Sequence, residues 1–171
     1  MKRLIILGAG GYGRTVADAA AQLETYSGIF FLDDNAQNAA VLGKCADFSD
    51  FSDGDTVFYP AFGNNESRLN WIKRLQIAGC AVPVIVHPQS YVSPTVQLAP
   101  GTVILPHAVV NTGCRIETGC IVNCGAIVDH DCVLEAGVHI CLGAIVKAEN
   151  RIGQCMKIEA GEIIMNRTYP L

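Results

Sequence analysis

One spacing governs the second half of the chain: an aliphatic residue stands at every sixth position from Val92 to Ile164. All thirteen of these positions hold Val, Ile or Leu, although these types supply only 44 of the 171 residues. A helix would repeat its apolar residues about every 3.6 positions and an alternating strand about every 2, so neither explains a strict six. Hexapeptide repetition is typical of a parallel β-helix, whose short strands turn corners and stack. We therefore predict a parallel β-helix over residues 91–171.

Glycine supports this prediction, because it occupies the third position after the aliphatic residue in seven of the thirteen hexads. Glycine tolerates the positive φ that tight corners demand. The next position is mostly small, which would allow a narrow prism to close. Three hexads would make one triangular coil, so residues eighteen apart should lie above one another. The corner glycines are Gly101, Gly113, Gly119, Gly125, Gly137, Gly143 and Gly161.

Composition excludes several classes of protein. No apolar run approaches the ~18 residues that a membrane span needs, and residues 1–7 are better interpreted as a strand than as a signal peptide. The net charge of −4 argues against general nucleic-acid binding. The eight cysteines form no C-x-x-C and have no histidine at zinc spacing, so we expect reduced thiols in a cytoplasmic protein and no metal site.

The first half of the chain has the pattern of a nucleotide-binding α/β unit. A strand over residues 3–7 leads into Gly8-Ala9-Gly10-Gly11-Tyr12-Gly13, and a helix follows to about residue 23. A second strand, over residues 28–32, ends at Asp33-Asp34, twenty residues after the last glycine. A Gly-x-Gly-x-x-Gly between strand and helix, with an acid about twenty residues on, is typical of dinucleotide sites. Amides at a helix N-terminus bind phosphate.

Only one mononucleotide half fits before the repeat begins. The pattern predicts a strand at 56–59, a loop at 61–65, a helix at about 66–78 and a strand at 82–86, which complete a domain over residues 1–86. Residues 87–90 would form the linker. The residues alone leave three readings of the glycine loop open: an NAD site, a site for another phosphate-bearing nucleotide, or a structural turn. An NAD enzyme would need a second half and a substrate domain.

Four histidines are candidates for chemistry on the polar outer surface. His130 lies between two acids in Val128-Asp129-His130-Asp131, so a carboxylate is available to hold its tautomer and support its protonated form. The same cluster could also be a solvated polar corner. His139 would lie on an outer face, His107 at a corner, and His87 in the linker, where we expect a structural role.

With these pieces assembled, the chain resembles the left-handed β-helix acyltransferases that carry an N-terminal nucleotide-sugar domain. That family includes UDP-4-amino-sugar N-acetyltransferases and sialic-acid O-acetyltransferase relatives. Left-handedness is implied by the family alone, since the general rule for parallel crossovers would give right-handed coils. The motifs that carry the resemblance lie at 8–13, 31–34, 63–68, 130–133 and 137–140.

The resemblance implies a role for particular residues. His130 would be the general base and Asp131 would orient it, while the amide of Ala148, one coil above, would stabilise the oxyanion. His139 would contact acetyl-CoA, and the active sites would lie between neighbouring prisms of a homotrimer. The residues implied for the nucleotide sugar are Gly10, Gly11, Tyr12, Asp33, Asp34, Gly63 and Asn64.

The expected function is direct transfer of an acetyl group from acetyl-CoA to an amino or hydroxyl group of a nucleotide-linked sugar such as a UDP-amino sugar. No metal and no covalent enzyme intermediate are expected, and the setting would be cytoplasmic polysaccharide biosynthesis. Three alternatives stay open. They are a non-catalytic trimer that binds a nucleotide sugar, an O-acetyltransferase of the sialic-acid type, and an NAD-dependent enzyme.

Overall fold

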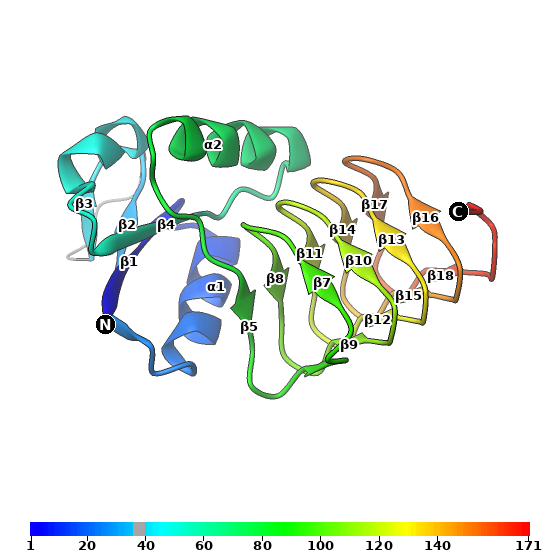
Figure 1. The fold of residues 1–171 in the computed structure, drawn as a ribbon. Helices are drawn as coiled ribbons and strands as arrows, with labels where there is room; N and C mark the ends of the chain where they lie inside the picture. The colour runs from blue at the N-terminus through cyan, green and yellow to red at the C-terminus, as the bar shows by residue number, and fades with distance from the viewer. Residues whose placement is uncertain (36–39) are drawn as a thin grey trace. The chain divides into compact units, whose positions relative to one another are not determined.

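The repeat of six folds as two-residue strands that stack in three parallel sheets (Figure 1). The computed structural model describes residues 1–35 and 40–171, and the chain divides into two units, 1–83 and 84–171. Strands eighteen residues apart pair in register, as Ile121 does with His139, so three hexads make one coil as predicted. The sheets have the orders β16-β13-β10-β7, β17-β14-β11-β8-β5 and β18-β15-β12-β9-β6. Their strands are β5 Ile85–Val86, β6 Tyr91–Val92, β7 Gln97–Leu98, β8 Val103–Ile104, β9 Val109–Val110, β10 Arg115–Ile116, β11 Ile121–Val122, β12 Ile127–Val128, β13 Val133–Leu134, β14 His139–Ile140, β15 Ile145–Val146, β16 Arg151–Ile152, β17 Lys157–Ile158 and β18 Ile163–Ile164.

The interior of the prism holds the aliphatic residue of each strand and the small residue of each corner. The small polar residues do more than fill space, because each donates to the carbonyl fifteen residues further on. The Cys114 thiol lies 3.0 Å from the Asp129 carbonyl oxygen, and the Cys132 thiol lies 3.2 Å from that of Lys147. Thr102 donates in the same way to Glu117. All eight cysteines are free thiols.

Every corner from residue 101 to residue 167 uses a left-handed backbone conformation, with φ between +55° and +76°. The glycine column is therefore confirmed as the corner column. Side chains in this conformation cost of the order of 1–3 kcal/mol and persist where something compensates for them. Three of the five corners that carry a side chain stack in one column above Gly113. They are Asp131, Glu149 and Arg167.

The repeat begins one hexad earlier than predicted. The second unit starts at Val84, and β5 pairs with β8, so this strand belongs to the prism and not to the first unit. The predicted linker is a corner, in which the His87 amide donates to the Ile104 carbonyl at 2.9 Å and the Ser90 amide donates to that of His87. Val86 lies six residues before Val92 and packs on the core. The absence of a corner glycine beside Pro88 hides this hexad in the sequence.

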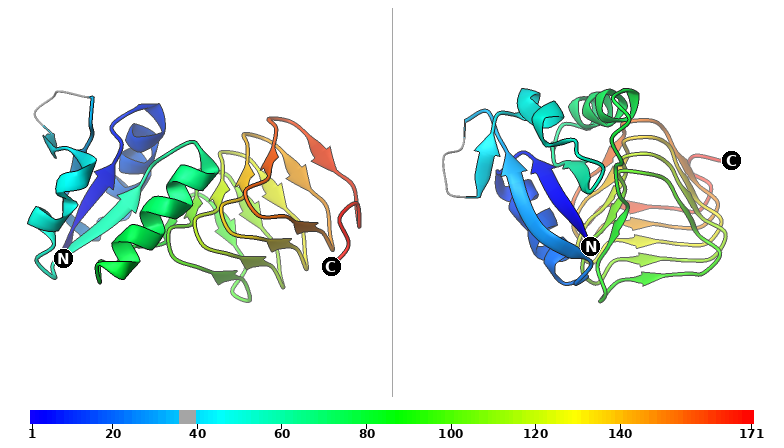
Figure 2. Two further views of the ribbon diagram at one scale, coloured as in Figure 1. Left: turned by 90° about the horizontal axis from the view of Figure 1, so that it is seen from above. Right: turned by 60° about the vertical axis from the view of Figure 1, so that its left-hand side comes forward.

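The first unit is a four-stranded parallel sheet of order β3-β2-β1-β4. Helix α1 covers one face, while η1 and α2 share a core cluster on the other (Figures 1 and 2). Strand β3 and helix η1 were not predicted, since three residues of strand and a polar turn carry little periodicity. The elements are β1 Lys2–Leu7, α1 Gly11–Ala21, β2 Tyr26–Leu32, β3 Val41–Gly43, η1 Cys45–Phe51, β4 Thr56–Pro60 and α2 Asn65–Ile77.

The strand order places a topological switch point at β1, because β2 and β4 flank it on opposite sides. Ligands of open α/β sheets bind at the carboxyl ends of the strands at such a point. Here that edge carries the loop after β1, residues 8–10, and the loop after β4, residues 61–64. Among the described residues, no helix combines the length and apolar composition that crossing a bilayer requires.

Candidate active site

The glycine loop after β1 contains two kinds of glycine. Gly8 has a φ of +102°, and a Cβ on Gly13 would lie 1.9 Å from the Gly8 carbonyl oxygen, so the loop itself requires both. Gly10 and Gly11 are exposed, have no left-handed φ, and a Cβ on either would meet nothing within 4 Å. The protein's own packing therefore does not require glycine at these two positions. A ligand that approaches the backbone closely would.

The loop after β4 repeats this feature on the other side of the switch point. The Ala61 amide donates to the Leu7 carbonyl at 2.8 Å, which ties the two loops together. Gly63 is exposed, and a Cβ there would also meet nothing within 4 Å. The structure thus brings Gly10, Gly11 and Gly63 to one edge of the sheet, as bare backbone beside the N-terminus of α1.

The polar residues predicted to bind the nucleotide also build these loops. Asp33 accepts from the Ala9 amide at 2.7 Å, and Asp34 accepts from the Cys45 amide at 3.0 Å. Asn64 caps α2 by accepting from the Ser67 amide at 2.8 Å. Each side chain keeps acceptor or donor capacity beyond these bonds.

Tyr12 lies at the same edge of the sheet, where its hydroxyl is 2.9 Å from that of Tyr59. Burial raises the pKa of Tyr12 to about 12. The phenol is therefore protonated at neutral pH and can donate a hydrogen bond.

Arg68 is a buried residue that the sequence analysis did not single out. Its guanidinium donates to the Phe62 carbonyl and to the Asn65 side-chain oxygen, both at 2.8 Å, and is fully buried. This holds the β4 loop in shape and adds a positive charge at the edge where a phosphate is expected. Only its place in the motif Gly63-Asn64-Asn65-Glu66-Ser67-Arg68 could have drawn attention to it, since it falls on a helix of no clear apolar face.

In the prism, His130 stands at the corner between β12 and β13. Its Nδ1 lies 2.8 Å from Asp131 Oδ2, and its side chain is 47% exposed. The hydrogen bond to Asp131 raises the pKa of His130 above 6.5, and the charges of Asp129 and Glu149 act in the same direction. Gly113 makes room for this pair, because a Cβ there would lie 2.2 Å from the Asp131 carboxylate. The structure therefore brings the predicted base and its partner together.

Asp129, the other acid beside His130, has a different position. Its carboxylate accepts from the His130 backbone amide at 2.8 Å and from Asn111 Nδ2 at 3.0 Å, and these bonds lower its pKa. The charge of His130 and the Ala148 backbone amide act in the same direction. Asp129 thus organises the backbone around the imidazole, and neither it nor Asn111 was assigned a role from the sequence alone.

Ala148 lies eighteen residues beyond His130, one coil above, and is buried. The next amide, that of Glu149, donates to the His130 carbonyl at 3.2 Å and joins the two corners. Glu149 also forms an ion pair with Arg167, which lowers the pKa of its carboxyl group.

His139 lies on β14, with Ile121 of β11 below it and Lys157 of β17 above it. Its Nε2 is 3.2 Å from Asn123 Nδ2, a contact that the sequence analysis missed. His139 therefore faces outward from a different sheet of the prism than the corner that carries His130.

The two remaining histidines have no part in this arrangement. His87 is buried and accepts from the Gln89 amide through Nδ1, while burial and the charge of His107 lower its pKa. His107 occupies a left-handed corner. His87 has the structural position that was expected, although in a corner of the prism.

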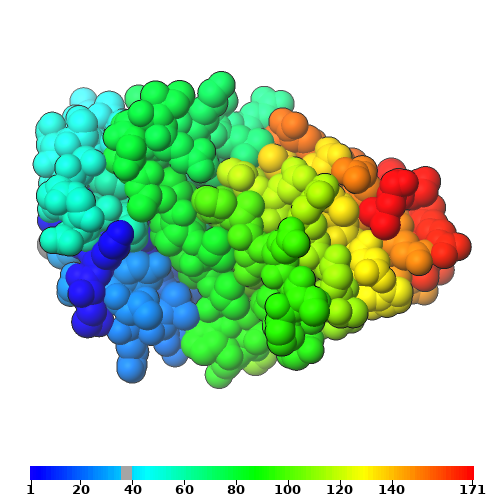
Figure 3. Space-filling view, viewed as in Figure 1, coloured from blue at the N-terminus to red at the C-terminus, as the bar shows by residue number. Residues whose placement is uncertain are grey.

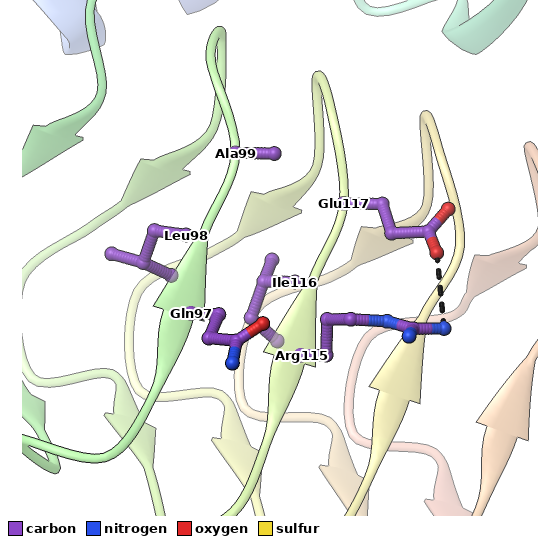
Figure 4. A pocket seen from close by; sticks show the side chains of 6 residues that line it. All are labelled: Gln97, Leu98, Ala99, Arg115, Ile116 and Glu117. Carbon is purple, nitrogen blue, oxygen red and sulfur yellow. Dashed lines mark ion pairs between the residues drawn. The ribbon is translucent and has the colours of Figure 1, made fainter.

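Two further features of the described residues bear on the site. No group of three or more His, Cys, Asp or Glu side chains in the described part of the chain is arranged to hold a metal ion. A cavity of about 260 Å³ opens beside β7 and β10, where Arg115 and Glu117 form an ion pair at 3.4 Å (Figure 4). None of the predicted site residues lines it. Its lining consists of Gln97, Leu98, Ala99, Arg115, Ile116 and Glu117.

Comparison with known proteins identifies the family. The family model of the PglD N-terminal domain matches residues 3–75. The acetyltransferase domain of PglB from Neisseria gonorrhoeae FA1090 is 38% identical with a TM-score of 0.93, over 95% of this chain and 82% of that one. The chain belongs to the hexapeptide-repeat sugar N-acetyltransferases. As a member of this family, the protein is an acetyl-CoA-dependent acetyltransferase with a left-handed β-helix.

Further solved structures are similar to this chain, two of them at lower identity. The same PglB domain is also known in complex with acetyl coenzyme A. PerB from Caulobacter crescentus, in complex with CoA and GDP-perosamine, is 17% identical with a TM-score of 0.63, over 96% of this chain and 92% of that one. WeeI from Acinetobacter baumannii AYE is 17% identical with a TM-score of 0.73, over 99% and 94%. No curated protein matches the chain.

Proposed function

We propose that the protein transfers the acetyl group of acetyl-CoA to an amino group of a nucleotide-linked sugar, with a UDP-amino sugar as the expected acceptor. The observation that carries this proposal is the His130–Asp131 pair. Asp131 engages Nδ1 at 2.8 Å, which leaves Nε2 of a half-exposed imidazole for the acceptor. An imidazole held in one tautomer by a carboxylate is suited to general-base catalysis.

In the proposed reaction, the sugar amine attacks the thioester carbonyl while Nε2 of His130 takes a proton from the nitrogen. A carbon–nitrogen bond forms, the carbon–sulfur bond breaks, and the imidazolium returns the proton to the CoA thiolate. Asp131 stabilises the imidazolium. The amide of Ala148, which lies one coil above His130, would donate to the oxygen on which negative charge develops.

The N-terminal unit is proposed to bind the nucleotide. Bare backbone at Gly10, Gly11 and Gly63, together with the N-terminus of α1, offers amides to a diphosphate. The buried charge of Arg68 favours an anion at the same edge. Asp33 and Asp34 would use their remaining acceptor capacity for the ribose or the base, and Tyr12 and Asn64 would donate. The GDP-perosamine bound by PerB supports a nucleotide sugar as the ligand class.

A homotrimer is proposed from the outer face of the sheet β6-β9-β12-β15-β18. The outward residue of all five strands is apolar, and its end members Tyr91 and Ile163 are 56% and 53% exposed. Such a face in a repeat protein fits a second copy of itself. The corner that carries His130 directly follows one of its strands, so each active site would lie beside a neighbouring prism. These five outward residues form an apolar column, which consists of Tyr91, Val109, Ile127, Ile145 and Ile163.

Calorimetry and product analysis with a panel of UDP-amino sugars, acetyl-CoA and NAD test this function. We expect heat of binding for acetyl-CoA and for one class of amino-sugar nucleotide, and an N-acetylated product when both are present. Tight binding of a nucleotide sugar without any binding of acetyl-CoA would favour the non-catalytic alternative. An O-acetylated product would favour an O-acetyltransferase of the sialic-acid type, and binding of NAD alone would favour the NAD-dependent enzyme. The cytoplasmic location stays a prediction.

Asp131→Asn should move the pH profile of the reaction. In the wild type, the raised pKa of His130 means that the free base is lost as the pH falls through a value above 6.5. Without the carboxylate this pKa drops, so the acid limb of kcat/KM shifts to lower pH. The plateau should fall about tenfold, because the imidazolium loses its partner.

Asp131→Gly provides the matched control for this shift. It removes the same carboxylate but suits the left-handed corner, as Gly113 does one coil below, so it should not lower the unfolding temperature. Both variants should shift the acid limb alike. An acid limb that stays in place in both would show that Asp131 does not set the basicity of the group being titrated.

A further inference from the structure

Asn150 is the polar residue that closes the small inward column of the prism. Cys132 and Cys114 lie eighteen and thirty-six residues before it, and their thiols donate to the Lys147 and Asp129 carbonyls. Asn150 is fully buried, and its Nδ2 lies 2.8 Å from the Lys147 carbonyl oxygen and 2.9 Å from that of Met165. Other corners fill this position with alanine, so packing alone does not require an amide here. Its hydrogen bonds are therefore the feature to explain.

These bonds connect the end of the chain to the corner above His130. The Asn150 side-chain oxygen accepts from the Tyr169 amide at 2.8 Å, and the Arg151 amide donates to the Tyr169 carbonyl at 2.7 Å. Nδ2 also approaches the carbonyl oxygen of Ala148 at 3.4 Å. In the space-filling view the C-terminal residues, in red, lie against the last coils, in orange (Figure 3).

The same corner is also anchored from below and from outside. The Glu149 amide donates to the His130 carbonyl, and the Glu149 carboxylate pairs with Arg167. Asn150 is the buried member of this set. Its Nδ2 lies within hydrogen-bond distance of the Lys147 and Ala148 carbonyl oxygens, one before and one after the Ala148 Cα. Loss of its side chain would leave the part-buried Tyr169 amide without its acceptor and would take one donor from the Lys147 and Met165 carbonyls. The corner could reduce this cost only by moving.

We propose that Asn150 is a positioning residue for acetyl transfer, which ties Met165 and Tyr169 to the 147–150 corner and so holds the Ala148 amide at its height above His130. This inference rests on the proposed role of Ala148 as oxyanion donor. Removing an oxyanion-hole donor outright costs about 10²–10³-fold in kcat. Misplacing it should cost less, so we expect a loss of about tenfold.

The test compares Asn150→Ala with Thr102→Ala. Thr102 occupies the same inward position of its hexad, is fully buried and donates to the Glu117 carbonyl at 3.0 Å, but at a corner on a different edge of the prism. Both variants should lower the unfolding temperature. Only Asn150→Ala should lower kcat, by about tenfold, with little change in KM for acetyl-CoA or in the acid-limb pKa, since His130 and Asp131 stay intact.

Asn150→Cys extends the test to a residue type that this column already accepts. A thiol has one hydrogen to donate and is only a weak acceptor. It could therefore replace one donor bond of Asn150 but not the bond from the Tyr169 amide, so kcat should fall by less than in Asn150→Ala. If Asn150→Ala does not fold, this variant decides. Wild-type kcat in Asn150→Cys, or an equal loss in Thr102→Ala and Asn150→Ala well below their unfolding temperatures, would overturn the inference.

His130→Ala, assayed in parallel, separates this inference from the proposed function. If His130→Ala loses the reaction and Asn150→Ala keeps it, the positioning role is wrong and the general base stands. If His130→Ala keeps the reaction, the proposed mechanism fails and Asn150 has no oxyanion donor to position.

Discussion

Replacing His130 with alanine is expected to lower kcat by about 10²–10⁴-fold, the usual contribution of a general base. The amine of the acceptor would then have to lose its proton to water, and the Asp131 carboxylate would lose the imidazolium that it stabilises. His130 is half-exposed and lies outside the core cluster of the prism. We therefore expect an unchanged unfolding temperature and unchanged binding of acetyl-CoA by calorimetry, so that the loss is confined to the chemical step.

His139→Ala is the matched control, because it removes a second imidazole from the same prism. His139 lies on β14 in another sheet, where it contacts Asn123. The family resemblance assigns it to acetyl-CoA. This variant should raise KM for acetyl-CoA and leave kcat largely intact. The proposed assignment of the base to His130 would be wrong if His130→Ala retained the wild-type kcat, or if His139→Ala lost it instead.

Replacing Ile145 with glutamate is expected to yield monomers and to abolish activity. Ile145 is the fourth of the five residues of the apolar column, paired with Ile127 below and Ile163 above. Burying an isoleucine side chain contributes about 1.5–3 kcal/mol, and an unpaired carboxylate at an interface adds a larger penalty. The change occurs in every copy, so the assembly loses this free energy at each contact. Sedimentation velocity measures the state of association, and the acetyl-transfer assay measures the consequence.

Arg115→Glu tests whether the effect is specific to this column. Arg115 faces outward from another sheet, where it pairs with Glu117, and a reversed charge there should leave both the trimer and the reaction intact. Dissociation caused by Arg115→Glu in place of Ile145→Glu would move the interface to the sheet that contains β7 and β10. An active monomer in the Ile145→Glu variant would show that each chain carries a complete site.

The architecture could be predicted from the sequence because the direction of a side chain in a short strand is a local property. The aliphatic spacing marks each inward strand residue and the glycines mark the corners of the prism, and the structure confirms both. Strand β5 was assigned to the wrong unit, because Pro88 and its neighbours lack a corner glycine. Strand β3 was missed, since three residues are too few for a period. The left-handed sense followed only from the family resemblance, and the relatives confirm it.

The site was predictable where its partners are neighbours in sequence or stand one full coil apart. His130 and Asp131 are adjacent, and the eighteen-residue stack places Ala148 one coil above His130, while its role was implied by the family resemblance alone. Asn123 and Asn150 were missed, because their partners lie fifteen to nineteen residues away, at offsets that depend on how each corner turns. Arg68 was missed for a related reason. It donates to the Phe62 carbonyl and to the Asn65 side chain at the start of α2, and no periodicity in the sequence marks a buried guanidinium.

The in-register pairing of residues eighteen apart also limits how the length of this chain can change during evolution. Deleting a single residue within the prism would rotate every later aliphatic side chain out of the interior. Removing six would keep the interior filled but transfer each later residue to the adjoining sheet, which would part His130 from Ala148, the residue stacked on it. A whole turn of the spiral is the smallest excision that preserves both, so homologues should differ here by complete turns.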